Sequence, residues 1–345
     1  MLRGEDAVRL RAAPPEADLD PNREFPFNWI SSPPSESGQA IGGTAPLHDP
    51  ETRALRDFVL GHPNICFEQN FHTFGGLHIS PLDFCPEMTP DMTDAAAFGK
   101  LGEALHAASG YQVQGIFPPG EKDIAHGSYT TWLYWGLGIT AYVTELWDWH
   151  RQCDPERNPA WSMFFVSCRE QFEREQTSAL RWDAEQNGGQ GFMDWIPFDH
   201  PQLGPVEIGG WREKFTSWNP PAHLLQGVLD RGFATCMASL AALPRVGIDS
   251  VRTLAGTEKG VQVEIAVSNR GFLPAASSHL AETKGYGDLR ISVGTGETAE
   301  EKQLVNLEGY SRLRVVLEVP GQKGNPATVT LRGTRCGETR VKIIL

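Results

Sequence analysis

Long apolar runs, an excess of basic residues and closely spaced cysteines are all missing from this 345-residue sequence. No apolar run approaches the roughly 20 residues that a membrane span needs. Acidic side chains outnumber basic ones by 43 to 30, whereas a nucleic acid or an anionic membrane requires a basic face. The six cysteines are scattered, which disfavours a zinc ribbon and favours a reducing compartment. We therefore expect no nucleic-acid partner and no membrane partner.

The first 20 residues lack the apolar core of a secretory leader, so we expect a cytoplasmic protein. Hydrophobic residues make up 40% and charged residues 21% of the chain, as in globular proteins. The length favours two domains, and the character of the sequence changes near residue 244.

Helix-like and strand-like segments alternate in the first part of the chain. Helices are expected at 49–60, 94–110 and 128–138, and strands at 64–72, 111–117 and 139–147. This alternation predicts an α/β domain whose sheet is mixed, mostly parallel and flanked by helices. Further helices are expected at 160–182 and 221–243, with a long Gly-, Pro- and aromatic-rich loop at 188–211 between them.

The C-terminal part consists of short β-branched runs separated by Gly, Asn and Pro. Such runs lie at 261–271, 288–296, 313–319, 327–334 and 339–345. They predict a small all-β sandwich. We therefore expect an α/β domain at 1–243 with a helical extension, followed by a β-sandwich domain at 244–345.

Asn22 and Arg23 stand in the stretch "DPNREFPFNW" between prolines. One interpretation is an irregular loop, since Pro21 and Pro26 bar regular structure and Asn suits a turn. The other is an anion-binding element, because an arginine fork grips a carboxylate with two hydrogen bonds and a neighbouring amide can add a third.

His72 and Glu145 stand at the ends of two predicted strands. In open α/β sheets, sites form outside the carboxyl ends of the strands. His72 suits either a structural role or a functional one. Glu145 ends an apolar strand, where a carboxylate is costly unless it is paired or functional, so it is either a structural partner or a general base.

Four segments, in this order, resemble the zinc metallocarboxypeptidases of the carboxypeptidase A type. They are "DPNREFP", "GGTAPLHDPETRALRDF", "NFHTFGGLHISP" and "HGSYTTWLYWGLGITAYVTELWD". The resemblance covers about residues 20–150, and "FDHPQLGPVEIGGW" is similar to an extension of some bacterial members. It implies a carboxypeptidase-like fold, a zinc cofactor and the C-terminus of a peptide or protein as substrate.

The resemblance also implies a role for individual residues. Asn22 and Arg23 would bind the free C-terminal carboxylate, and Thr130 would line the pocket for the terminal side chain. His72 would be a zinc ligand. Glu145 would be the general base that takes a proton from the zinc-activated water.

The sequence departs from this family in two respects. The family's His-x-x-Glu zinc motif precedes its Asn-Arg pair, but the 21 residues before Asn22 contain no histidine, so we expect an N-terminally incomplete domain. The strings "HDPE" at 48–51 and "HLAE" at 279–282 are not expected to replace it. Thr131 stands where an acid is common, so no preference for C-terminal Lys or Arg is predicted.

We therefore expect a zinc-dependent metallocarboxypeptidase, a hydrolase that carries out proteolysis. The chain by itself lacks two zinc ligands and is expected to be inactive alone. One alternative is a catalytically inactive relative that binds peptide C-termini or a protein partner. A structural module with only an architectural resemblance is the third hypothesis.

Overall fold

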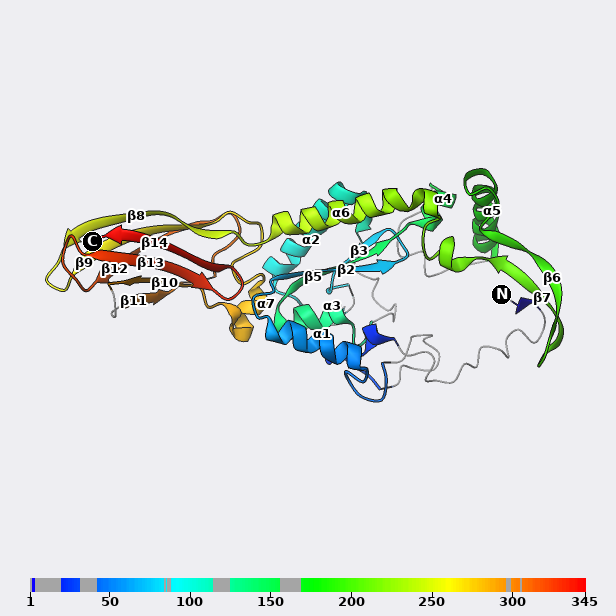
Figure 1. Ribbon diagram of the computed structural model, residues 1–345, viewed down its shortest axis with the longest axis horizontal. Helices are drawn as coiled ribbons and strands as arrows, with labels where there is room; N and C mark the ends of the chain where they lie inside the picture. Colours follow the sequence, from blue (N-terminus) through cyan, green and yellow to red (C-terminus); the bar gives the residue numbers. More distant parts are fainter. Residues whose placement is uncertain are drawn as a thin grey trace.

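The computed structural model describes residues 2–3, 20–31, 42–83, 85, 88–113, 125–155, 169–295, 299–304 and 306–345. A mixed sheet with flanking helices lies at the centre of the described part (Figure 1). A long helix and a β-hairpin lie at one end of it, and two antiparallel sheets lie at the other. No helix in these ranges is long and apolar enough to cross a membrane.

The central sheet has the strand order β2-β5-β3-β4. Its members are β2 (Phe67–Thr73), β5 (Thr140–Leu146), β3 (Leu77–Ile79) and β4 (Gln112–Val113). Strands β2 and β5 run parallel, as do β3 and β4, whereas β3 runs antiparallel to β5. The predicted mixed, mostly parallel sheet is therefore confirmed, while the three-residue β3 was too short to predict. Residues 114–117 of the strand predicted at 111–117 lie outside the described ranges.

Helices cover both faces of this sheet (Figure 1). They are α1 (Pro50–Gly61), α2 (Met92–Ser109), α3 (Tyr129–Thr131), the π-helical turn η4 (Trp132–Gly136) and α6 (Leu225–Ala242). Successive residues of β5 point to opposite faces. Ala141 packs with Val59 of α1, and Tyr142 packs with Phe98 of α2 and Ala242 of α6. These two clusters hold the helices on either side.

Local sequence sets the ends of the helices near the site. Helix α1 begins after Asp49, with Pro50 at its first position, as its fixed φ favours. Helix α2 begins after Asp91, whose side chain accepts a hydrogen bond from the backbone N–H of Thr93. It ends at Gly110, which has a φ of 75°.

A helix and a hairpin follow the central sheet along the chain. The elements are α4 (Trp149–Cys153), α5 (Arg169–Gln186), β6 (Phe192–His200) and β7 (Gly204–Trp211), with β1 (Leu2–Arg3) paired to β7. Short 3₁₀ turns at η6 (Glu213–Phe215) and η7 (Ala222–Leu224) lead into α6. Residues 160–168 of the predicted helix lie outside the described ranges.

The expectation of a long loop at 188–211 was wrong, because β6 and β7 form an antiparallel hairpin there. Most residues of β6 are exposed or half-buried, so no buried face imposes the alternation of apolar and polar residues by which strands are predicted. Asp183 fixes the start of the hairpin. Its carboxylate accepts hydrogen bonds from the backbone N–H groups of Gly191 and Phe192.

The C-terminal part forms two antiparallel sheets, of order β12-β9-β8 and β11-β10-β13-β14. The strands are β8 (Val246–Gly256), β9 (Val261–Asn269), β10 (Arg290–Gly294), β11 (Ala299–Gln303), β12 (Arg312–Val319), β13 (Pro326–Gly333) and β14 (Gly337–Ile344). Ile265 of one sheet and Ile291 and Val329 of the other belong to one buried cluster. Short antiparallel strands are present as predicted, and the predicted boundary at 243/244 falls between α6 and β8.

Arg335 joins the antiparallel sheets to the central part. Its Nη1 donates to the carbonyl oxygens of Gly138 and Ala276, and its Nη2 donates to that of Leu137. The loop between β9 and β10 contains α7 (His279–Ala281) and the π turn η8 (Glu282–Tyr286). The side chain of Arg335 lies over the ring of Tyr286, 4.1 Å from its centroid.

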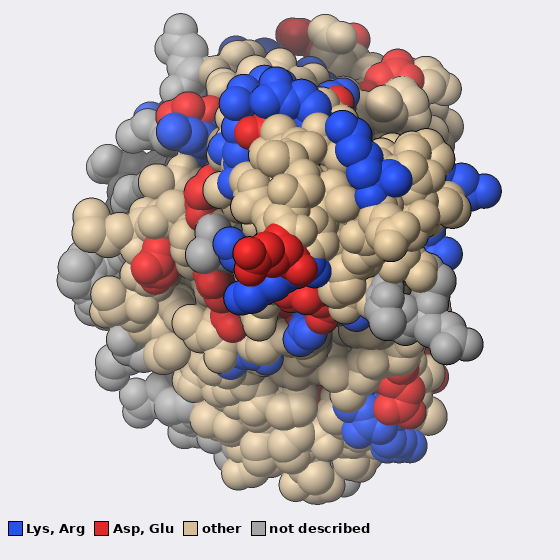
Figure 2. Space-filling model, turned by 90° about the vertical axis from the view of Figure 1, so that its left-hand side faces the viewer, with Lys and Arg blue, Asp and Glu red and all other residues tan. Residues whose placement is uncertain are grey.

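The tip of the antiparallel sheets carries acidic and basic side chains beside one another (Figure 2). Glu301 pairs with Arg290 and Arg332, and Asp249 pairs with Arg270 and Arg312. These ion pairs lie along the two sheets rather than at the tip, and they balance the two signs locally there.

Candidate active site

His72 and Glu145 lie side by side on the parallel strands β2 and β5. The two residues are Cα partners in the register of the sheet. Side chains that are opposite each other in register share a face, and Nδ1 of His72 lies 3.7 Å from Oε1 of Glu145. The sheet thus brings together two residues that lie 73 positions apart in the sequence.

Burial controls the charge of both groups. It raises the pKa of Glu145 from 4.5 to about 8. The pKa of His72 is lowered, chiefly by burial. The charge of Asp20 opposes this shift, and that of Arg23 adds to it. At neutral pH the contact therefore joins a mostly protonated carboxyl group to a neutral imidazole. Oε2 of Glu145 is buried and has no hydrogen-bond partner among the described residues.

The Asn22–Arg23 pair lies in a short 3₁₀ turn, η3 (Pro21–Arg23). The side chain of Asp20 caps the turn by accepting a hydrogen bond from the backbone N–H of Asn22. Oδ1 of Asn22 accepts a hydrogen bond of 2.9 Å from the backbone N–H of Tyr129, at the start of α3. Because Oδ1 is used in this way, the amide nitrogen of Asn22 is the group that can donate to a ligand.

Two glycines let the chain pack closely against this turn. A Cβ at Gly42 would lie 1.9 Å from the carbonyl oxygen of Arg23, and one at Gly127 would lie 2.2 Å from it. Any other residue at either position would displace the turn. The guanidinium of Arg23 stays local: Nη1 donates to the carbonyl oxygen of Asn22 and lies 3.7 Å from a carboxylate oxygen of Asp20.

A pocket of about 410 Å³ opens where η3, α1, β2 and α3 meet. Asn22, Tyr129 and His72 line it, together with Pro21, Phe25, Glu51, Thr52, Leu55, Glu68 and Asn70. Of the residues predicted from the sequence, Asn22 and His72 are therefore in the lining. Glu145 lies beside His72 but is not in the lining, and neither Arg23 nor Thr130 is in the lining. Thr130 is fully buried, and its hydroxyl has no partner within the described part of the chain.

Glu68 is a pocket residue that the sequence analysis missed. It precedes Asn70 and His72 on β2 at a spacing of two, so all three side chains point to the pocket face. Burial raises the pKa of Glu68 to about 8, and its Oε2 has no partner in the described residues. The signal was present in the sequence, because "FEQNFH" places three polar residues on one face of a strand.

The residues around His72 do not fit a complete catalytic zinc site. Such a site ordinarily takes three protein ligands. All ten histidines lie in the described ranges. Within those ranges, three His, Cys, Asp or Glu ligand atoms lie within 4.8 Å of one another only at Glu24, His48 and Asp49. His72 thus supplies one ligand position. Neither "HDPE" nor "HLAE" places a second metal ligand beside His72.

The chain matches one family model and several known proteins. Residues 5–180 match the family model for zinc carboxypeptidases, so the chain belongs to the zinc carboxypeptidase family. Mast cell carboxypeptidase A from Homo sapiens is 30% identical over 125 residues, which are 35% of this chain and 30% of the relative. The Rattus norvegicus protein is 28% identical over 125 residues, with the same two shares.

The structure of carboxypeptidase A from Helicoverpa armigera is 19% identical, with a TM-score of 0.31. The match covers 49% of this chain and 43% of that one. The match to each mast cell enzyme spans 30% of that relative's length.

Proposed function

We propose that this protein is a metallocarboxypeptidase that removes the C-terminal residue of a peptide or protein. One observation carries the proposal: the pocket joins the Asn22 turn to His72, and Glu145 stands beside His72. A donor for a terminal carboxylate and a base for hydrolysis therefore lie at one site. Membership of the zinc carboxypeptidase family supports the same reaction.

Asn22 and Arg23 bind the α-carboxylate of the substrate in this proposal. The amide nitrogen of Asn22 points its donors at the ligand, and the guanidinium of Arg23 exchanges Asp20 for the substrate carboxylate. That exchange is inexpensive, because the Arg23–Asp20 contact is long, at 3.7 Å, and both side chains are partly exposed. A two-pronged bond to the carboxylate then replaces a weak ion pair.

Glu145 serves as the general base. Its carboxylate takes a proton from the water that attacks the terminal peptide carbonyl, and it returns the proton to the amine as the C–N bond breaks. Its raised pKa makes the ionised form a stronger base than an exposed glutamate. The family implies zinc, and His72 offers one ligand. The remaining ligands would have to be residues that do not lie around His72 in the described part of the chain.

A second function, binding of peptide C-termini without hydrolysis, is favoured by one observation. His72 belongs to no group of three metal-binding side chains in the described ranges, although every histidine lies within them. The pocket, the Asn22 turn and Glu68 do not depend on a metal ion. Such a protein would recognise the terminal residue and release it unchanged.

Peptide binding and peptide cleavage separate these two functions. We would measure binding of matched free-acid and C-terminally amidated peptides to the full chain, and release of the terminal residue in zinc-containing buffer. Binding of the free acid at least about tenfold tighter than the amide is expected, since a charged hydrogen bond is lost. Cleavage abolished by Glu145→Gln, with binding retained, supports the hydrolase; binding without cleavage supports the second function.

The exposed Glu103→Gln on α2 is the matched control and should change neither quantity. Equal binding of the acid and the amide would overturn both functions, because neither could then depend on the terminal carboxylate.

A further inference from the structure

Glu24, which follows the Asn22–Arg23 pair, is fully buried yet only half satisfied. Its Oε2 accepts hydrogen bonds from the backbone N–H of Asp49, at 2.8 Å, and from Oγ1 of Thr52, at 2.7 Å. It therefore caps the first turn of α1 from a distant part of the chain. Its Oε1 is also buried but has no hydrogen-bond partner in the described part of the chain. A buried carboxylate oxygen without a partner is unfavourable unless a cation or donor satisfies it.

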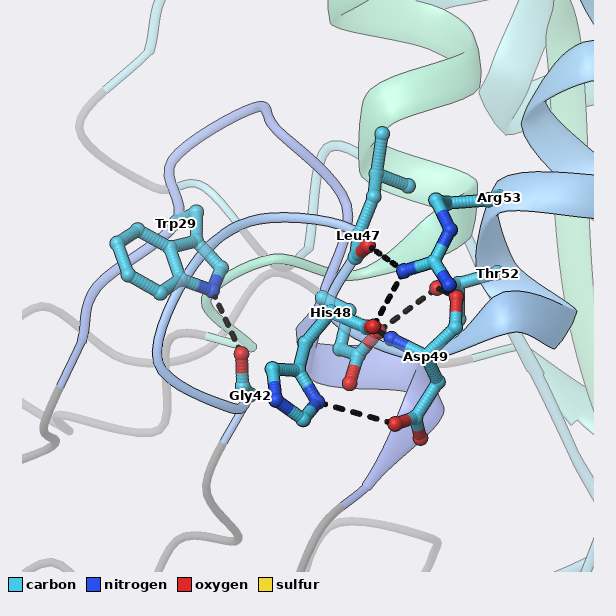
Figure 3. Close-up of polar contacts among 8 residues, drawn as sticks. Trp29, Gly42, Leu47, His48, Asp49, Thr52 and Arg53 are labelled. Atoms are coloured by element: carbon cyan, nitrogen blue, oxygen red, sulfur yellow. Dashed lines mark hydrogen bonds and ion pairs between the residues drawn. The ribbon is translucent and has the colours of Figure 1, made fainter.

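His48 and Asp49 lie near the carboxylate of Glu24. One ligand atom from each of Glu24, His48 and Asp49 lies within 4.8 Å of the other two. Figure 3 shows the imidazole of His48 beside the carboxylate of Asp49, and Nδ1 lies 3.1 Å from Oδ1. The side chain of His48 is 42% exposed and that of Asp49 is 26% exposed. The group thus has a closed side at Glu24 and an open side through which an ion can enter.

The backbone around the group holds His48 in place. Leu47 has a φ of 57°, a conformation that an L side chain rarely adopts. Nη1 of Arg53 donates to the carbonyl oxygens of Leu47 and His48, which fixes the loop on α1 (Figure 3).

Gly43 leaves the room for this group. A Cβ there would lie 2.6 Å from Cβ of His48 and 3.4 Å from Oε1 of Glu24. The absence of a side chain at 43 therefore allows His48 and the unsatisfied oxygen to approach each other.

We propose that Glu24, His48 and Asp49 bind one divalent cation of the zinc class. An imidazole nitrogen with two carboxylate oxygens is a ligand set that zinc accepts, whereas magnesium and calcium prefer oxygen alone. Zinc bonds of about 2.1 Å place tetrahedral ligand atoms roughly 3.4 Å apart. The three atoms lie within 4.8 Å of one another, so they have to close by at most about 1.4 Å, which rotation of the partly exposed His48 and Asp49 side chains can supply.

Electrostatics also favours a cation at this place. Two carboxylates contribute about −2, which outweighs the roughly +0.5 that the N-terminus of α1 presents together with the +1 of Arg53. Arg53 directs its guanidinium hydrogens at carbonyl oxygens. The bound ion would link the segment carrying Asn22 and Arg23 to the start of α1. It would thereby hold the anion-binding turn without touching a ligand in the pocket. This cation site does not depend on the carboxypeptidase function proposed above.

The test is metal titration of the full chain after removal of metal with a chelator. Co²⁺ absorption and Zn²⁺ calorimetry should both show one equivalent whose binding does not require His72. His48→Ala should weaken binding at least about tenfold. Asp49→Asn should do the same while preserving the start of α1, because asparagine has the same size and the Asp49 side chain makes no capping hydrogen bond that could be lost.

Two histidine variants serve as controls, His62→Ala at the other end of α1 and His72→Ala in the pocket. Both should keep the metal equivalent. Loss of the metal in His72→Ala, with retention in His48→Ala, would place the ion in the pocket and overturn the proposal. Absence of binding by the unaltered chain would also overturn it, whereas peptide binding at the pocket, measured separately, decides the proposed function.

Discussion

Replacing Glu145 by glutamine is expected to stabilise the folded protein, and the gain should grow as the pH rises from 5 to 8. Burial raises the pKa of Glu145 from 4.5 to about 8, so between these values the folded state binds a proton that the unfolded state has released. Rising pH therefore destabilises the unaltered protein in this window. Each pKa unit corresponds to 1.36 kcal/mol, which gives about 3 kcal/mol at pH 7 and about 5 kcal/mol above pH 8. Glutamine keeps the shape and cannot ionise.

Urea unfolding followed by tryptophan fluorescence at pH 5, 6, 7 and 8 measures this effect. The free energy of unfolding of Glu145→Gln should exceed that of the unaltered protein by an amount that increases with pH, and the two should converge below pH 4.5. Glu103→Gln, at an exposed position, should follow the unaltered protein throughout. Parallel pH profiles for Glu145→Gln and the unaltered protein would refute the reasoning, because the carboxyl group would then be as well solvated in the folded state as in the unfolded one.

Three further predictions concern the pocket and the junction of the two parts. Arg23→Lys should weaken binding of free-acid peptides about tenfold and leave amidated peptides unchanged, since lysine keeps the charge and loses the fork; equal weakening of both would contradict the carboxylate role. Glu68→Gln should reduce any preference for peptides ending in Lys or Arg over Leu about tenfold above pH 8, because Glu68 places in the lining a carboxyl group that ionises only near that pH. Competition binding measures this preference, and an unchanged preference would contradict the role of Glu68. Arg335→Met should lower the free energy of unfolding by about 3 kcal/mol, because buried carbonyl oxygens lose their donor. Arg332→Met, at an exposed position, should lower it by less than about 1 kcal/mol. Similar losses in the two variants would refute the buried role of Arg335.

The helices near the site followed from local chemistry and could therefore be predicted. Asp49 with Pro50 marks the start of α1, and Gly110 marks the end of α2, because each residue suits one backbone position. The hairpin at β6 and β7 could not be found in this way. Its pairing depends on contacts between strands and on the Asp183 carboxylate, and its exposed faces leave no periodic pattern in the sequence.

The pairing of His72 with Glu145 was predictable because parallel strands bring their carboxyl ends to one edge of a sheet. Tertiary packing decided the rest of the site. Thr130 is buried in α3 outside the lining, and Glu68 enters the pocket because the alternation of β2 points it there. Of the pocket lining, the sequence therefore predicted Asn22 and His72 but not Glu68.

The distribution of unsatisfied carboxyl oxygens is itself an argument for ligands at this end of the sheet. Among the described residues, four carboxyl groups have a buried oxygen without a hydrogen-bond partner: Glu24, Glu68, Glu145 and Asp249. Asp249 is an exception, because Arg312 lies 2.9 Å from that oxygen. The other three lie beside the Asn22–Arg23 turn or around the pocket that it lines. A buried carboxyl group of this kind lowers the stability of the fold, and an uncharged side chain of the same size would not. A cation at Glu24 and a substrate in the pocket would satisfy them, which gives one physical reason for all three.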